Sequence, residues 1–171
     1  NEIKIVNNQV FREKIIKKQL KNQKGAVFNI QYLAEEKENL KTFYTNKGYT
    51  LFYIEKIYLD PNNNLVYEFS EGVISDINFL GLKKIEKHVL LRELDSKVGQ
   101  IFNIQKIQND RTALARLGYF KEIPLPKLTF GQTKSEVVLT YELEEKKFNN
   151  IILGIETEDD SVLSFFDYKI N

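Results

Sequence analysis

The chain of 171 residues has a formal net charge of +1 at pH 7, and 42% of its residues are apolar. This balance excludes a disordered acidic chain and a protein that binds nucleic acid through overall positive charge. The absence of cysteine excludes disulfides and thiolate chemistry, and the single histidine, His88, cannot form a metal site alone, so we predict no metal and no cofactor. The chain lacks an initiating methionine, and we expect it to be a fragment of a longer protein.

A tandem repeat organises the sequence. Residues 25–31 read Gly-Ala-Val-Phe-Asn-Ile-Gln and return as Gly-Gln-Ile-Phe-Asn-Ile-Gln at residues 99–105, an offset of 99 − 25 = 74 residues. The alignment slips by four residues before the next shared pair, Gly48 and Gly118. Two copies of one small unit are therefore predicted. The expected divisions are a unit at 1–72, a second unit at 73–147, and a segment at 148–171.

Each unit is predicted to begin with a short strand and an amphipathic helix. Apolar residues alternate at Ile3 and Ile5, and again at Ile77 and Phe79, which is typical of a half-buried strand. The next apolar residues of both units fall on one helical face. They are Phe11, Ile15, Ile16 and Leu20 in the first unit and Ile85, Val89, Leu90 and Leu94 in the second.

A second helix is expected after a glycine, with asparagine as its N-cap and phenylalanine just before the cap. That phenylalanine would pack on the fourth helical residue as a hydrophobic staple, so we expect it to be buried in both units. The residues concerned are Gly25, Phe28 and Asn29 in the first unit and Gly99, Phe102 and Asn103 in the second.

Gly48 and Gly118 are expected to end these second helices, since a left-handed glycine closes a helix without a steric clash. The apolar period then changes from about 3.6 to 2, which predicts a β-hairpin over 50–69 and another over 123–144. Each unit thus reads strand, helix, helix, strand, strand. The sequence predicts an α+β fold of two tandem units, each with a three-stranded sheet covered on one face by two helices.

The joint order of these motifs resembles the POTRA domains of the BamA-type outer-membrane insertase superfamily, which includes TamA, two-partner secretion transporters and the organellar Toc and Sam channels. Besides the residues before the second helix, the resemblance rests on Gly48-Tyr49 and Gly118-Tyr119 after it, and on Glu71-Gly72 between the units. Gly81 is similar to the glycine that follows the family's first strand. Asn7 and Asn8 depart from the Gly-Asn expected at the corresponding turn.

The resemblance implies a non-enzymatic POTRA region in the bacterial periplasm, attached to an outer-membrane β-barrel of the same chain. Its implied partners are unfolded outer-membrane protein clients and accessory assembly proteins, not nucleic acid. Adjacent acids such as Glu144 and Glu145 lack a partner base, so we predict no catalytic residue. Residues 148–171 are expected either to begin the barrel or to form a disordered tail.

Clients of diverse sequence suit β-augmentation, in which an extended peptide pairs with the free backbone of an edge strand. The resemblance implies that the first hairpin strand of a unit is such an edge. In the second unit this strand contains Pro124 and Pro126, which lack N–H groups, whereas the first unit has no proline or glycine there. We predict the peptide-binding edge at Thr50, Leu51, Phe52, Tyr53, Ile54, Glu55, Lys56, Ile57 and Tyr58.

Two alternatives remain open. Tandem KH-like RNA-binding domains also begin strand, helix, helix, strand, but they need two glycines in the loop between the helices, where each unit has one, Gly25 or Gly99. A POTRA-like interaction module of an adhesion or division complex is the other alternative. Many alternating strands after Asn171 would indicate a barrel instead.

Overall fold

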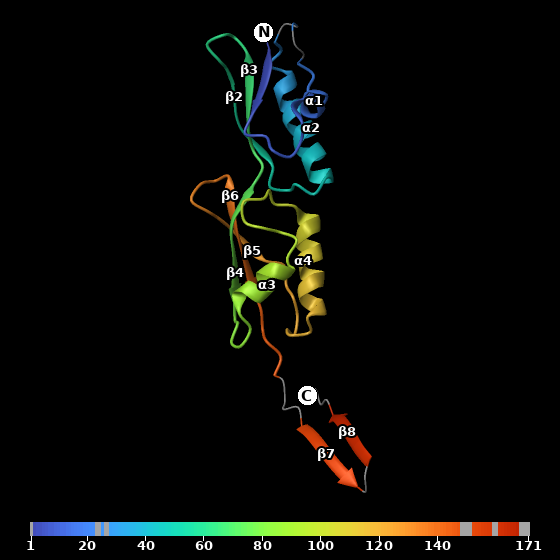
Figure 1. Ribbon diagram of the computed structural model, residues 1–171. Coiled ribbons are helices and arrows are strands. Elements are labelled where there is room, and N and C mark those ends of the chain that lie inside the picture. Colours follow the sequence, from blue (N-terminus) through green and yellow to red (C-terminus); the bar gives the residue numbers. More distant parts are fainter. Residues whose placement is uncertain (1, 23–24, 26–27, 148–151, 159–160, 168–171) are drawn as a thin grey trace.

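The computed structural model describes residues 2–22, 25, 28–147, 152–158 and 161–167. Two units follow one another along the chain (Figure 1). The elements of the first are β1 (Ile3–Val6), α1 (Glu13–Lys17), α2 (Tyr32–Asn46), β2 (Tyr53–Leu59) and β3 (Leu65–Ser70). Those of the second are β4 (Val73–Leu80), α3 (Lys87–Glu93), α4 (Ile104–Arg116), β5 (Lys127–Phe130) and β6 (Glu136–Glu142).

Both units have the same sheet topology. The first and third strands pair in parallel and the hairpin strands pair antiparallel, which gives the orders β1-β3-β2 and β4-β6-β5. The helices of each unit lie on one face of its sheet (Figure 1) and form the crossover that a parallel pair requires. The predicted α+β fold of two strand-helix-helix-strand-strand units is confirmed.

After the second unit, β7 (Ile152–Glu158) and β8 (Ser161–Asp167) pair antiparallel as a separate two-stranded sheet. The prediction for the C-terminal segment, a barrel start or a disordered tail, falls partly on residues 148–151, 159–160 and 168–171. These lie outside the described residues, so this remains a prediction.

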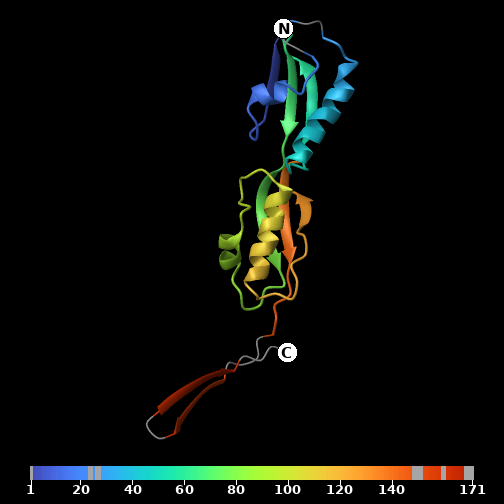
Figure 2. The ribbon, with the colours of Figure 1, turned by 90° about the vertical axis from the view of Figure 1, so that its right-hand side faces the viewer.

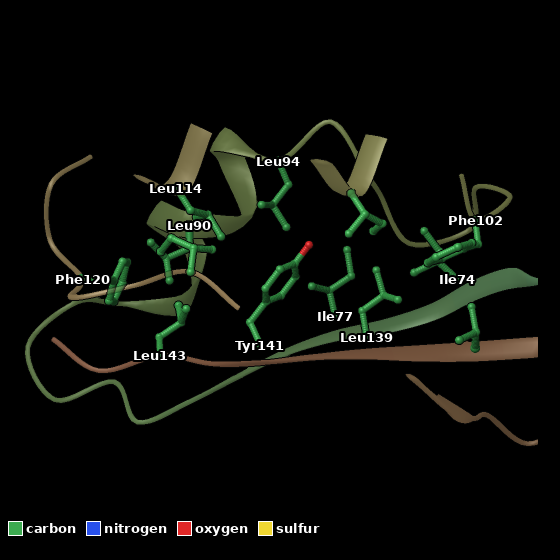
Figure 3. Packing of buried hydrophobic residues seen from close by; sticks show 13 residues of the cluster. Ile74, Ile77, Leu90, Leu94, Phe102, Leu114, Phe120, Leu139, Tyr141 and Leu143 are labelled. Carbon is green, nitrogen blue, oxygen red and sulfur yellow. The ribbon is translucent and has the colours of Figure 1, made fainter. Parts of the chain in front are cut away.

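The core of each unit lies between its sheet and its helices, and the two cores use equivalent positions. At the offset of 74, buried Ile16 corresponds to buried Leu90, and Tyr67 corresponds to Tyr141. Figure 3 shows the second core, in which Tyr141 extends from β6 between Ile77 and Leu94. Apolar burial of this kind contributes about 25 cal/mol per Å² and is the main stabilising term of such small units.

A buried carboxylate joins the two helices of the first unit. Glu36 on α2 is 0% exposed and accepts hydrogen bonds from the backbone N–H groups of Lys21 and Asn22, at 2.7 and 2.6 Å. The Tyr67 hydroxyl donates to the same carboxylate at 2.5 Å. Burial, and then the Glu36 carboxylate, raise the pKa of Tyr67 above its usual range. The chain that leaves α1 is therefore held against α2 by polar contacts inside the core.

Asp110 takes the equivalent place in the second unit and accepts from the N–H groups of Asp95 and Ser96, at 2.5 and 3.2 Å. Aspartate is one methylene shorter than glutamate. Among the described residues, neither Asp110 Oδ2 nor the Tyr141 hydroxyl has a hydrogen-bond partner. Burial, followed by the charge of nearby Asp110, still raises the pKa of Tyr141.

A second pair of equivalent carboxylates closes the turn after the first strand. Glu71 accepts from the N–H groups of Gln9 and Val10, at 2.7 and 3.2 Å, and from the Tyr44 hydroxyl at 2.7 Å. Glu145, which lies 74 residues later, accepts in the same way from the N–H groups of residues 83–85. Those N–H groups, that of Lys83 foremost, lower the pKa of Glu145. The acidic residue at each junction thus belongs to the preceding unit's fold.

The turn in which Asn7 and Asn8 replace Gly-Asn keeps the expected geometry. Asn7 has a φ of 63°, close to the left-handed conformation of its equivalent Gly81, whose φ is 86°. Asparagine tolerates this conformation better than most residues because its side chain can bond locally.

The expectation that Phe28 is buried like Phe102 is wrong. Phe102 is 2% exposed, whereas Phe28 is 37% exposed. In the second unit the Phe102 N–H donates to Gly72 O of the preceding unit at 2.8 Å, which holds the phenylalanine in the core. No described residue donates or accepts in this way for the Phe28 backbone. The difference is therefore one of tertiary contacts, which the local repeat does not encode.

Replacing these two phenylalanines should separate their roles. We expect Phe102→Ala to lower the free energy of unfolding of the second unit by about 3 kcal/mol, because it empties a fully packed site. Phe28→Ala should cost less than about 1 kcal/mol, since its ring already contacts water. Urea unfolding followed through amide signals of each unit measures both values. Equal losses for the two variants would contradict the assignment.

Candidate binding edge and the joint between the units

Strand β2 is an edge of the first sheet, because its only described strand partner is β3. Six of the nine predicted edge residues, 53–58, lie in this strand, which continues to Leu59. Thr50, Leu51 and Phe52 do not, which corrects the predicted strand start. Phe52 is 4% exposed and stacks on Tyr44, with ring centroids 3.7 Å apart, while its N–H donates to Tyr49 O. These three residues form the turn that leads into the edge.

A β-bulge divides the edge strand. The pairing register with β3 runs through Ile54 and resumes at Lys56, so Glu55 is the extra residue. The bulge explains why Ile54 and Ile57, three positions apart, both pack on the core. Tyr53 and Tyr58 are 36% and 46% exposed, and the sequence pattern did not predict the bulge.

The equivalent edge of the second unit is shorter. Strand β5 covers only Lys127–Phe130, whereas the sequence predicted a strand over 123–130. Pro124 and Pro126 lie before it, where their missing N–H groups cost no sheet hydrogen bond. Leu128 and Phe130 are 43% and 76% exposed on this strand.

The joint between the units places the C-terminus of α2 against the N-terminus of α4 (Figure 1). The carbonyl of Lys47 accepts from Asn103 Nδ2 at 3.0 Å, and the carbonyl of Gly48 accepts from the N–H of Ile104 at 2.9 Å. Asn103 also caps α4, since its Oδ1 accepts from the N–H of Gln105 at 2.9 Å. Unpaired groups at two helix ends thus satisfy each other, with opposite ends of the helix dipoles in contact.

Two glycines make this approach possible. Gly48 has a φ of 88°, and a Cβ there would lie 2.6 Å from Asn103 Oδ1. A Cβ on Gly72 would lie 2.8 Å from the Cβ of Leu51, a first-unit residue that packs against the second core. The sequence predicted Gly48 as a helix end, and it follows α2 after one capping residue. Its contact with the next unit was not predicted.

The remaining motif residues are structural. Gly118 follows α4 and, like Gly25 and Gly99, has a positive φ. The Tyr119 carbonyl accepts from the N–H of Lys146 at 2.8 Å. Asn29 was predicted as the N-cap of the second helix, but α2 begins at Tyr32. Its Oδ1 still accepts from the N–H of Gln31 at 2.9 Å, the bond that Asn103 makes in the second unit.

Acidic residues and His88 do not gather into a group of three or more potential metal ligands anywhere in the described part of the chain. The helices of that part are too short or too polar to cross a membrane.

The two repeated α+β units, joined end to end, define a class of tandem strand-helix-helix-strand-strand domains. The sequence profile of the POTRA family, described as surface antigen variable number repeat, matches residues 1–72 and 73–146. The chain therefore belongs to the POTRA family. This match favours the POTRA interpretation over the KH-like one, and no enzyme family is indicated.

Known proteins agree with this assignment. A candidate outer membrane protein assembly factor of Treponema pallidum (strain Nichols) is 25% identical over 160 residues, which cover 90% of this chain and 19% of that protein. The N-terminal domain of Omp85 from Thermosynechococcus elongatus is 25% identical, with a TM-score of 0.77, covering 86% of this chain and 66% of that one. The three POTRA domains of Omp85 from Anabaena share the fold, at 20% identity and a TM-score of 0.70, covering 85% and 64%. The chain thus spans about a fifth of the curated relative.

Proposed function

We propose that this chain is the periplasmic POTRA region of an outer-membrane assembly or translocation protein, attached to a β-barrel. It binds unfolded client chains or accessory subunits by β-augmentation along β2. The observation that carries the proposal is the free side of this seven-residue strand, which contains neither proline nor glycine. Backbone N–H and C=O groups on such an edge pair with an extended peptide whatever most of its side chains are, which suits clients of varied sequence.

The other edges offer less backbone. Strands β1 and β5 have four residues each. Strand β4 is longer, but its start is occupied by the chain itself: Ile74 donates to Gln100 O at 2.8 Å and accepts from Gly99 N–H at 2.7 Å. The bulge at Glu55 and the charge of Lys56 limit nonspecific pairing of β2 with strands of other molecules, but they do not block the edge.

A pair of peptides tests the role of backbone pairing. The first is about nine residues of alternating valine and threonine, long enough to cover one strand, and the second has the same sequence with every backbone amide N-methylated, so that neither of its edges can donate. We expect the first peptide to shift the amide signals of residues 53–59 of the labelled chain. Its methylated twin should leave them unchanged, because it cannot donate along the edge.

Two variants at one exposed position provide the matched comparison. Glu55→Pro removes one N–H of β2 and fixes the backbone at this residue, so it should weaken binding of the first peptide, whereas Glu55→Ala keeps the N–H and should bind normally. Shifts at 127–130 without shifts at 53–59 would show that the edge is wrongly chosen. Binding that survives N-methylation would refute β-augmentation and favour an adhesion or division-complex module that recognises side chains.

A further inference from the structure

A hollow of about 410 Å³ lies between the two units. Its walls come from the start of β2, from the joint and from β5 and β6. The residues on which its character depends are Leu51, Tyr53, Gly72, Leu128, Phe130 and Val137. Most of these side chains are apolar. Glu136, the carboxylate in the lining, is already engaged, because it accepts from the N–H groups of Gln132 and Thr133 at 2.8 and 3.2 Å.

The two free edges reach this hollow from opposite sides and run in the same direction. Strand β4 continues from β3 after only Glu71 and Gly72 (Figure 1). Strand β2 is antiparallel to β3, and β5 is antiparallel to β6, which itself is parallel to β4. Strand β5 therefore ends at the hollow with Phe130, and β2 begins at the hollow with Tyr53. In Figure 2 the short light-orange arrow of β5 points towards the first unit.

We propose that this hollow receives a large apolar side chain of an extended polypeptide that pairs with β2 and continues along β5. The proposal rests on the β-augmentation proposed above. It adds the position at which the protein distinguishes one side chain of the bound polypeptide from another. An occupant with extended backbone is favoured because both rims of the hollow are edge strands of one direction, each with no second strand partner among the described residues. A single segment can therefore follow both without reversing.

The chemistry of the walls selects the side chain. Phe130 is 76% exposed at the end of an edge strand, an arrangement that natural proteins avoid unless the surface is covered. An aromatic or large aliphatic residue entering between Leu51 and Phe130 would remove both from water. A polar residue would lose part of its hydration there, although Lys134 at the rim could offset this loss for an acidic residue.

The spacing sets the length of the segment. Seven residues of β2 and four of β5, with the hollow between them, correspond to an extended segment of about 13 residues at roughly 3.3 Å per residue. Its anchoring side chain would lie nearer one end than the other, because the two edges differ in length. Augmentation along β2 would thus tolerate most sequences, while the joint would favour those with an apolar residue in one register.

Two probes test this inference. One is a peptide of about 13 residues of alternating valine and threonine with a phenylalanine placed to enter the hollow, and its twin has alanine at that position. We expect the phenylalanine peptide to bind the 171-residue chain about tenfold more tightly and to shift the amides of Gly72, Leu128 and Phe130. Phe130→Ser should abolish that advantage. Leu125→Ser is the matched control, because Leu125 is 52% exposed in the same segment but does not line the hollow.

The outcomes separate the two proposals. Suppose that both peptides shift the amide signals of residues 53–59 and bind with equal affinity, and that Phe130→Ser changes neither result. The hollow then does not select a side chain, and only this inference is overturned. If neither peptide shifts 53–59, β-augmentation itself fails. The remaining alternative is that a second copy of this chain fills the hollow, and sedimentation of the protein without peptide tests it. A dimer that Phe130→Ser dissociates would show this and would also overturn the inference.

Discussion

Gly81→Ala should destabilise the second unit by about 4 kcal/mol, the largest effect we expect from removing a glycine in this chain. Two costs combine. Gly81 has a φ of 86°, where an L-residue is strained by roughly 1–2 kcal/mol. A Cβ would also lie 2.1 Å from the carbonyl oxygen of Leu143, a backbone atom that cannot rotate away. The strand ends would have to separate, and the hydrogen bond from Leu143 N–H to Leu80 O would weaken.

Gly118→Ala is the matched control for this prediction. Gly118 also has a positive φ, 72°, but a Cβ there meets nothing within 4 Å, so the loss should be about 1 kcal/mol of strain alone. Urea unfolding observed through amide signals of the second unit compares the two. Similar losses would mean that the β4 and β6 ends are not held as closely as the structure indicates.

Glu36→Ala should lower the free energy of unfolding of the first unit by about 4 kcal/mol, since it leaves buried donors without an acceptor. The N–H groups of Lys21 and Asn22 and the hydroxyl of Tyr67 all donate to this carboxylate. A loss of this size is a large part of the 5–15 kcal/mol that typically stabilises a domain. Hydrogen exchange of the Asn22 amide reports the same event locally.

Glu35→Ala, one residue earlier, provides the control. Its carboxylate is 51% exposed and pairs with Lys21 at 2.6 Å on the surface, so its removal should cost less than about 0.5 kcal/mol. Glu36→Gln keeps the volume and one acceptor oxygen, and should lie between the two. If Glu36→Ala were as mild as Glu35→Ala, water would have to reach the donors in the folded protein.

Repetition made most of the fold predictable. Many apolar positions that recur at the offset of 74 are buried in both units, such as Leu40 and Leu114, although Phe28 and Ile15 are exposed. The offset also aligned Glu36 with Asp110, and an acid retained on two otherwise apolar helix faces was a signal for the buried carboxylates. The slip of four residues at Gly118 is made up before the last strand: Gly48 precedes Leu65 by 17 residues, and Gly118 precedes Leu139 by 21.

What the sequence missed depends on partners far along the chain. The bulge at Glu55 shifts which side chains face the core, and alternation of β-formers in the sequence does not reveal an extra residue. The exposure of Phe28 reflects missing tertiary contacts, since its local sequence matches that of buried Phe102. The hollow beside Phe130 requires two units in one orientation, which no local pattern encodes.

The contact between α2 and α4 also makes the stability of one unit depend on its neighbour. Carbonyls of Lys47 and Gly48 and donors of Asn103 and Ile104 each have one protein partner across the joint, so melting either helix end leaves the other to water. The two units should therefore unfold with a nearest-neighbour coupling, as in a short one-dimensional array. The contact is asymmetric, because the groups on its two sides differ. One unit contributes a helix C-terminus, and the next contributes a capped helix N-terminus. Such a contact cannot close on itself as a symmetric pair does, and it gives the array a direction.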